Sequence, residues 1–179
     1  MRGKIEFQHF WGNIFHRIEK RKNRETADDL KEIPLFSDLS TRELRIITDI
    51  IHLRNYGKDE FIFKKGQPGA AMFIIKSGTV MIQDVAGQGD SKKAIDLVTL
   101  TEGAFFGELA LLDDSPRSAY ARAVVPVEAY ALFRADLYKI LDATPTISSK
   151  IYYSLARIIG ERLKKMNAQL FGTGHEHKN

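Results

Sequence analysis

The spacing of hydrophobic positions changes along the chain and divides it into three parts. Apolar residues recur at intervals of three and four near both ends, which is the spacing of one face of an α-helix. Between Arg54 and Phe133 they instead form short runs, rich in β-branched and aromatic side chains and separated by glycine, proline and aspartate. Evenly spaced short strands of this kind are typical of an antiparallel sandwich or barrel. The sequence therefore predicts a mainly β fold with flanking helices.

Residues 1–29 predict an amphipathic helix with a basic end. Its apolar positions share one helical face; they are Phe7, Phe10, Trp11, Ile14, Phe15 and Ile18. We expect this stripe to pack on the domain's own helices or on a second copy of the chain, because large apolar side chains are usually buried. The pattern leaves open a contact with a membrane surface or with a groove on a partner protein.

Further helices are predicted on both sides of the strand-rich part. Ser40 with Glu43 three residues later is a capping box, so we expect a helix from about Thr41 to Leu53. A short amphipathic segment over 134–143 precedes Pro145, and a helix of several turns follows. Its apolar stripe is expected to be core or self-association surface, since burial is what mainly stabilises such a helix; it contains Ile151, Leu155, Ile158, Ile159, Leu163, Met166 and Leu170.

Length, charge and cysteine content narrow the class of protein. A chain of 179 residues with 44% hydrophobic content is long enough for one domain with extensions. The absence of cysteine excludes disulfides, a thiol nucleophile and a cysteine-ligated metal, and no signal peptide or membrane span is apparent, so a cytoplasmic location is expected. The net charge of +4 lies in the first 25 residues, and residues 26–179 hold 20 basic and 20 acidic side chains. A broad face that binds a phosphate backbone is therefore not expected.

The candidate chemistry lies in FGELALLDDSPRSA, residues 106–119. A short helix that starts at Gly107 would leave its first N–H groups free to bind an anion. Pro116 ends that helix, so Arg117 can return toward its start and offer a forked contact to a phosphate. The carboxylate of Glu108 would be repelled by a phosphate and needs a donor such as a ribose hydroxyl. These residues predict a compact sugar phosphate as the ligand, although a structural Glu108–Arg117 salt bridge is an alternative.

This stretch resembles the phosphate-binding cassette of the cyclic nucleotide-binding domain family, which is shared by the catabolite activator protein, protein kinase regulatory subunits and gated channels. The segments FGELALL and PRSA carry the resemblance, and IPLFSDLSTREL and GQPGAAMFIIKSGTV resemble the family's leading helix and glycine-bounded strands. The resemblance implies such a domain over 30–171. It would comprise an antiparallel β-roll, a double-stranded jelly roll, at about 54–133, then hinge and lid helices at about 134–170. Residues 172–179 would form a flexible tail.

The resemblance also implies a role for individual residues. Arg117 would bind the cyclic phosphate, and Glu108 would accept the ribose 2′-hydroxyl. The other cassette contacts would come from Phe106, Gly107, Leu109, Ala110, Ser118 and Ala119. Ile82 and Val98 would form apolar walls on the β-roll. The base would be covered by the C-terminal helix, with Arg162, Leu163 and Met166 as its contacts.

The function implied is that of a binding module and not an enzyme, with no cofactor or metal and with cAMP or cGMP as its ligand. The bacterial-activator-like segments GELALL and RSA favour cAMP, whereas Ser118 does not decide between the two. We expect the ligand to rearrange the lid helix and so signal to a homodimer or an unidentified protein partner. Few residues follow Phe171, so direct DNA binding is not expected.

Two alternatives to this function stay open. One is a protein-interaction or membrane-surface module whose nucleotide pocket is vestigial. The other is a metal-dependent β-barrel enzyme, which would need several histidines on strands. Of the five histidines, His52 lies at the edge of the strand-rich part, and the other four lie outside it.

Overall fold

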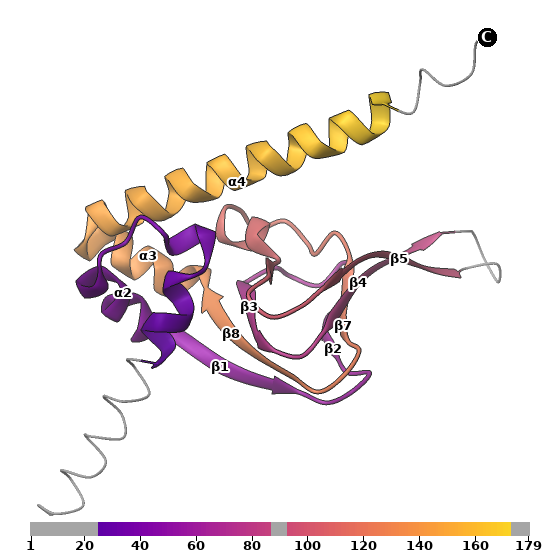
Figure 1. The fold of residues 1–179 in the computed structure, drawn as a ribbon, viewed down its shortest axis with the longest axis horizontal. Helices are drawn as coiled ribbons and strands as arrows, with labels where there is room; N and C mark the ends of the chain where they lie inside the picture. Colours follow the sequence, from indigo (N-terminus) through magenta and orange to yellow (C-terminus); the bar gives the residue numbers. More distant parts are fainter. Residues whose placement is uncertain (1–24, 87–92, 173–179) are drawn as a thin grey trace, which may run out of the picture.

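The computed structural model describes residues 25–86 and 93–172 (Figure 1). The aromatic stripe predicted at the N-terminus and the predicted tail beyond residue 172 lie outside the described residues. Residues 25–31 are helical. The elements that follow are η1 (Pro34–Phe36), α2 (Thr41–Thr48), β1 (Ile51–Tyr56), β2 (Phe61–Phe63), β3 (Ala71–Ser77), β4 (Val80–Ala86), β5 (Lys93–Leu100), β6 (Phe105–Phe106), η3 (Glu108–Leu111), β7 (Tyr120–Ala123), β8 (Val127–Phe133), α3 (Arg134–Ala143) and α4 (Pro145–Gly172).

The strands form the two antiparallel sheets of a β-roll. Within the described residues, one sheet has the order β1-β8-β3-β6 and the other the order β2-β7-β4-β5. All the paired strands run antiparallel. The β4–β5 hairpin projects from the end of the roll opposite to α2 and α3 (Figure 1). The predicted fold class, a mainly β roll with flanking helices, is confirmed.

Strand β3 is buried on both faces and separates two hydrophobic clusters. Met72 and Ile74 point into the cluster beneath the helices, whereas Phe73 and Ile75 point into the cluster between the sheets. This division follows from the alternation of side chains along a strand. It explains why the segment AMFII reads as a continuous apolar run. The β-roll interior also holds small side chains that let the sheets approach each other, Ala121, Ala123, Ala129 and Ala131.

Helix α2 begins where the sequence predicts but ends five residues earlier. The Ser40 hydroxyl accepts from the backbone N–H of Glu43, and the Glu43 carboxylate accepts from the backbone N–H of Ser40, which is the predicted capping box. The helix stops at Thr48 rather than Leu53, and residues from Ile51 onward pair with β8. This pairing with a distant strand overrides the local helical spacing, and the β-roll therefore starts at residue 51 instead of 54.

The C-terminal helices break where Pro145 predicts. Helix α3 ends at Ala143, and α4 starts at Pro145 and runs along one side of the molecule, past the β-roll (Figure 1). The first half of α4 is packed in the core through Ile147, Ile151 and Leu155. Residues 161–168 are all exposed. The second half of α4 thus extends over the β-roll with little apolar support.

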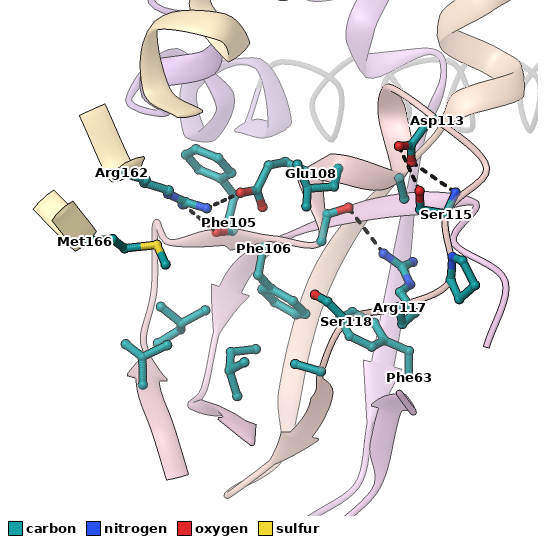
Figure 2. A pocket seen from close by; sticks show the side chains of 18 of the residues that line it. Phe63, Phe105, Phe106, Glu108, Asp113, Ser115, Arg117, Ser118, Arg162 and Met166 are labelled. Atoms are coloured by element: carbon teal, nitrogen blue, oxygen red, sulfur yellow. Dashed lines mark hydrogen bonds and ion pairs between the residues drawn. The ribbon is translucent and has the colours of Figure 1, made fainter. Parts of the chain in front are cut away.

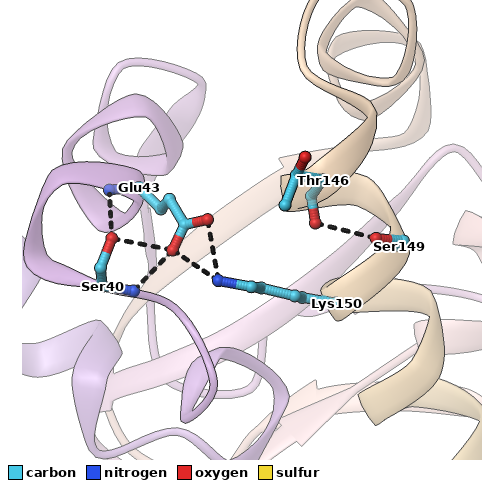
Figure 3. Close-up of polar contacts among 5 residues, drawn as sticks. All are labelled: Ser40, Glu43, Thr146, Ser149 and Lys150. Atoms are coloured by element: carbon cyan, nitrogen blue, oxygen red, sulfur yellow. Dashed lines mark hydrogen bonds and ion pairs between the residues drawn. The ribbon is translucent and has the colours of Figure 1, made fainter.

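A salt bridge joins α2 to the first turns of α4. The Nζ of Lys150 lies 2.9 Å from both carboxylate oxygens of Glu43, so the capping box is tied to the C-terminal helix (Figure 3). These bonds hold the pKa of Glu43 at about 2, the largest effect coming from the backbone N–H of Ser40 and the next from Lys150. Among the described residues, no helix is long and apolar enough to cross a membrane.

Candidate functional site

A pocket of about 600 Å³ lies between η3, the β-roll and the second half of α4 (Figure 2). Its lining is largely apolar and aromatic and includes five charged side chains. The lining residues are Phe63, Ile82, Val98, Leu100, Phe105, Phe106, Gly107, Glu108, Leu109, Ala110, Asp113, Ser115, Pro116, Arg117, Ser118, Ala119, Arg162, Lys165 and Met166. A cavity of this size and lining is typical of a small-molecule site.

Gly107 starts the short helix η3 in a left-handed conformation, with φ of +71°. Only glycine adopts this conformation without steric cost. A Cβ at this position would also lie 2.7 Å from Nη1 of Arg117 and 3.4 Å from a ring carbon of Phe63. Glycine is therefore favoured by the turn, and a larger residue would displace the end of the Arg117 side chain.

Arg117 returns to the start of η3, as the proline turn predicts. Its Nη1 donates to the carbonyl oxygen of Gly107 at 3.2 Å, and its Nη2 donates to that of Ala71 at 2.6 Å. The guanidinium carbon lies 4.1 Å from the centroid of the Phe63 ring. Burial lowers the pKa of Arg117 from its ordinary value, but an arginine stays charged. The side chain is thus a fixed, partly desolvated cation at the pocket.

The backbone around Arg117 is fixed as well. Its N–H donates to the carbonyl oxygen of Gln67 at 2.8 Å, and its own carbonyl accepts from the N–H of Gly66 at 2.8 Å. Pro116 forms an isolated antiparallel β-bridge with Pro68, which directly follows Gln67. The backbone contacts fix the point from which the side chain extends, and the contacts with Gly107, Ala71 and Phe63 fix the side chain itself.

Glu108 is buried at the first turn of η3, yet its partner is not Arg117. Its carboxylate pairs with Nη1 of Arg162, which reaches down from α4 (Figure 2). Nη2 of Arg162 donates to the carbonyl oxygen of Phe105 at 3.2 Å, and its guanidinium carbon lies 4.8 Å from the Phe105 ring centroid. The alternative of a Glu108–Arg117 salt bridge is not the arrangement found here. Instead, the acid connects the cassette to the C-terminal helix.

Most residues predicted for the site line this one pocket. The cassette residues from Phe106 to Ala110 and from Arg117 to Ala119 do so, and so do the paired strand residues Ile82 and Val98. On α4, Arg162 and Met166 line it, being four residues apart on one helical face.

Leu163 differs from the other predicted residues. It is 55% exposed and is not part of the pocket lining. It lies one residue beyond Arg162, which turns its side chain by about 100° around the helix, away from the face that covers the pocket.

Sequence reasoning missed several lining residues. Phe63, Phe105 and Lys165 gave no recognisable signal, because their positions depend on how distant segments pack. Leu100 could have been found, since it is two residues beyond Val98 and side chains alternate along a strand.

The two acids after η3 contact nearby side chains and backbone groups. Asp113 lies at the pocket rim and accepts from the N–H and hydroxyl of Ser115, which lowers the pKa of Asp113. Asp114 is exposed and pairs with Arg134. In the described part of the chain, no three histidine, cysteine or acidic side chains gather into a group that could hold a metal ion.

Comparison with known proteins gives the family. A family model described as the cyclic nucleotide-binding domain matches residues 53–144, and the chain therefore belongs to that family. It is 31% identical to the cyclic AMP receptor protein of Thermus thermophilus over 79% of this chain and 62% of the relative. It is also 31% identical to a cAMP-dependent protein kinase regulatory subunit of Colletotrichum orbiculare, over 74% of this chain and 32% of the relative.

The fold agrees with this assignment. A cyclic nucleotide-binding domain from Methylobacillus flagellatus matches with a TM-score of 0.72 and 24% identity, covering 86% of this chain and 84% of that one. The chain spans less than two thirds of the length of the curated relatives it matches. What it shares with them is the domain, and in such proteins this domain is regulatory.

Proposed function

We propose that this chain is a regulatory module that binds a cyclic mononucleotide, cAMP in preference to cGMP, and that it is not an enzyme. The observation that carries the proposal is the juxtaposition of Arg117, the first turn of η3 and the buried Glu108 at one pocket. A cation, free amide groups and an acceptor at one site match the phosphate and ribose of such a ligand.

The phosphate would be held by Arg117. Of the five N–H donors of its guanidinium, two are used by the carbonyl groups of Gly107 and Ala71, and the buried Nε has no partner among the residues that the structure describes. Two carbonyls and an aromatic ring hold the group in place before the ligand arrives, so little further conformational entropy need be lost on binding. An anion beside η3 would also meet its unpaired amide groups.

The ribose would be held by Glu108. One carboxylate has acceptor capacity for more than one donor, so Glu108 can accept a ribose hydroxyl while it keeps Arg162. Ligand and α4 would then share a single buried acid. Because residues 161–168 of α4 are exposed, the position of this half of the helix depends on its few contacts at the pocket. We infer that occupancy of the pocket is passed on through α4 to a partner protein or a second copy of the chain.

The preference for cAMP has two supports. The segments GELALL and RSA look like those of bacterial activators, and a relative at 31% identity is named as a cyclic AMP receptor protein. Calorimetric titration with cAMP, cGMP and linear 5′-AMP tests the proposal. We expect one saturable site, tightest for cAMP and weakest for 5′-AMP, because the second charge of the linear phosphate must be desolvated and is repelled by the buried Glu108 carboxylate. If neither cyclic nucleotide binds, the pocket is vestigial and the interaction-module alternative holds.

The assignment of Glu108 to the ribose has its own test. In the wild-type protein, 2′-deoxy-cAMP should bind more weakly than cAMP, because the carboxylate loses its donor. In Glu108→Ala the two ligands should bind equally, since two groups that are partners do not add their effects. A deoxy penalty that persists in the variant would assign the hydroxyl to another residue.

A further inference from the structure

Arg134, the first residue of α3, contacts the end of η3 opposite to the predicted ligand groups. Its side chain is 16% exposed. Nη1 donates to the carbonyl oxygen of Ala110 at 2.9 Å and to that of Asp113, and Nη2 pairs with the carboxylate of Asp114. One guanidinium therefore has three acceptors within five consecutive residues of the cassette.

Two of these acceptors are backbone carbonyls, one in the last turn of η3 and one just after it. The last carbonyls of a helix lack an intrahelical partner, and a cation placed there is favourable. In η3, which has four residues, the carbonyl of Ala110 is one of these groups, and the carbonyl of Asp113 follows two residues after the helix ends. Arg134 supplies their donors from another element, so the cassette end is fixed relative to α3.

The backbone of Arg134 is joined to the segment that holds Arg117. Its N–H donates to the carbonyl oxygen of Ala70 at 2.9 Å, and the carbonyl of the next residue, Ala71, accepts from Arg117. Ala71 in turn pairs with Phe133, the residue before Arg134. The two arginines are thus anchored one residue apart at the start of β3.

The same segment packs tightly against the cassette. A Cβ at Gly69 would lie 3.0 Å from the carbonyl oxygen of Ser115 and 3.1 Å from the Cβ of Ala110. The start of β3, the start of α3 and the end of η3 therefore meet at one seam. A shift of η3 at this seam would therefore disturb the contacts of Arg117 and those of α3 together.

We propose that Arg134 is a positioning residue for the nucleotide site: it holds the cassette end through the carbonyls of Ala110 and Asp113 and couples it to α3. This inference rests on the proposed function for its ligand. The contacts with the two carbonyls are expected to hold the cassette end. The ion pair with Asp114 contributes little, because the Asp114 side chain is 93% exposed and the pair is screened by solvent.

The test compares three variants with a matched control. Arg134→Met removes every side-chain donor but keeps an apolar side chain. Arg134→Lys keeps the charge. Asp114→Asn removes the exposed ion pair alone. Arg122→Met is the control, because Arg122 forms an ion pair with Asp59 and does not line the pocket. For each protein, the dissociation constant for cAMP is measured by calorimetry below its unfolding temperature. Hydrogen exchange of the amides over 107–115 is measured without ligand, with strand β1 as the internal reference.

We expect Arg134→Met to weaken cAMP binding by up to about tenfold, because the ligand must then supply the order that a charge-assisted hydrogen bond gives the free cassette, and to speed exchange over 110–115 selectively. Arg134→Lys should recover part of both losses. Asp114→Asn and Arg122→Met should stay within about twofold of the wild-type affinity, as expected for exposed pairs.

Three results would overturn the inference. One is unchanged affinity and exchange in Arg134→Met, and another is a lower melting temperature with wild-type affinity, which would assign a structural role only. The third is an equal loss in Asp114→Asn, which would make the ion pair responsible. If the wild-type protein binds no cyclic nucleotide, the proposed function fails, and selective exchange over 110–115 still decides whether Arg134 fixes the cassette.

Discussion

Substitution of Glu108 and substitution of Arg162, which form an ion pair, should cost different amounts of folding stability. The Glu108 side chain is 11% exposed, whereas that of Arg162 is 44% exposed. Removal of Arg162 would leave a buried carboxylate without its cation. Removal of the Glu108 charge would leave a guanidinium that water can still solvate. The cost of each substitution should therefore follow the burial of the group that remains.

The expected magnitudes lie between two limits. Removal of one member of a fully buried pair costs about 3–5 kcal/mol, whereas an exposed pair contributes about 0–1 kcal/mol. Because Arg162 is open to solvent on one side, we expect Arg162→Met to lower the free energy of unfolding by about 1–2 kcal/mol. For Glu108→Gln we expect about 0.5 kcal/mol, since the amide keeps an acceptor for Arg162.

Urea denaturation of the ligand-free protein measures these costs, with the double variant included so that the coupling can be calculated. Methionine is chosen at position 162 because its stem can keep the contact with the Phe105 ring. Lys164→Met is the matched control, being an exposed cation on the same helix that does not line the pocket. We expect a coupling energy of at least about 0.5 kcal/mol between Glu108 and Arg162. Equal costs for the two single variants, or costs that simply add in the double variant, would refute the reasoning.

Two further predictions concern stability and binding. Gly107→Ala should lower the free energy of unfolding by about 1–2 kcal/mol, the cost of a left-handed conformation, and should weaken cAMP binding because its Cβ meets the cassette arginine. Thermal unfolding and calorimetry would measure both, and a neutral result would contradict the assignment. For Glu43, the pKa is lowered from 4.5 to about 2 in the folded protein, so its contribution is fully present above about pH 4.5 and is lost as the pH falls toward 2. Lys150→Met should lose less stability than the wild type over that interval, and an equal loss would contradict the prediction.

The sequence was a good guide wherever the determining interactions are local. The β-roll could be predicted because strand alternation and turn residues act over a few positions, and Gly107, Glu108 and Arg117 could be singled out because they share one short segment. The end of α2 could not be predicted, because it depends on pairing with β8, about 80 residues further along the chain.

Contacts of the C-terminal helices were also beyond the reach of local patterns. Arg162 lies 54 positions from Glu108 in the sequence, and Arg134 lies 24 positions from Ala110. The spacing of the apolar stripe on α4 placed Leu163 together with Met166. Which of them lies over the pocket depends on the rotation of the helix, and packing of its first half fixes that rotation.

Arg117 is the residue that we propose binds the phosphate of a cyclic nucleotide in this pocket. Calorimetric titration of cAMP into the wild-type protein, Arg117→Met and the control Arg122→Met tests this role most directly. Loss of a charged hydrogen bond costs about 1.5–3 kcal/mol, so we expect Arg117→Met to bind at least about tenfold more weakly than the wild type. The control should bind as the wild type does. Wild-type affinity in Arg117→Met would show that Arg117 does not bind the phosphate.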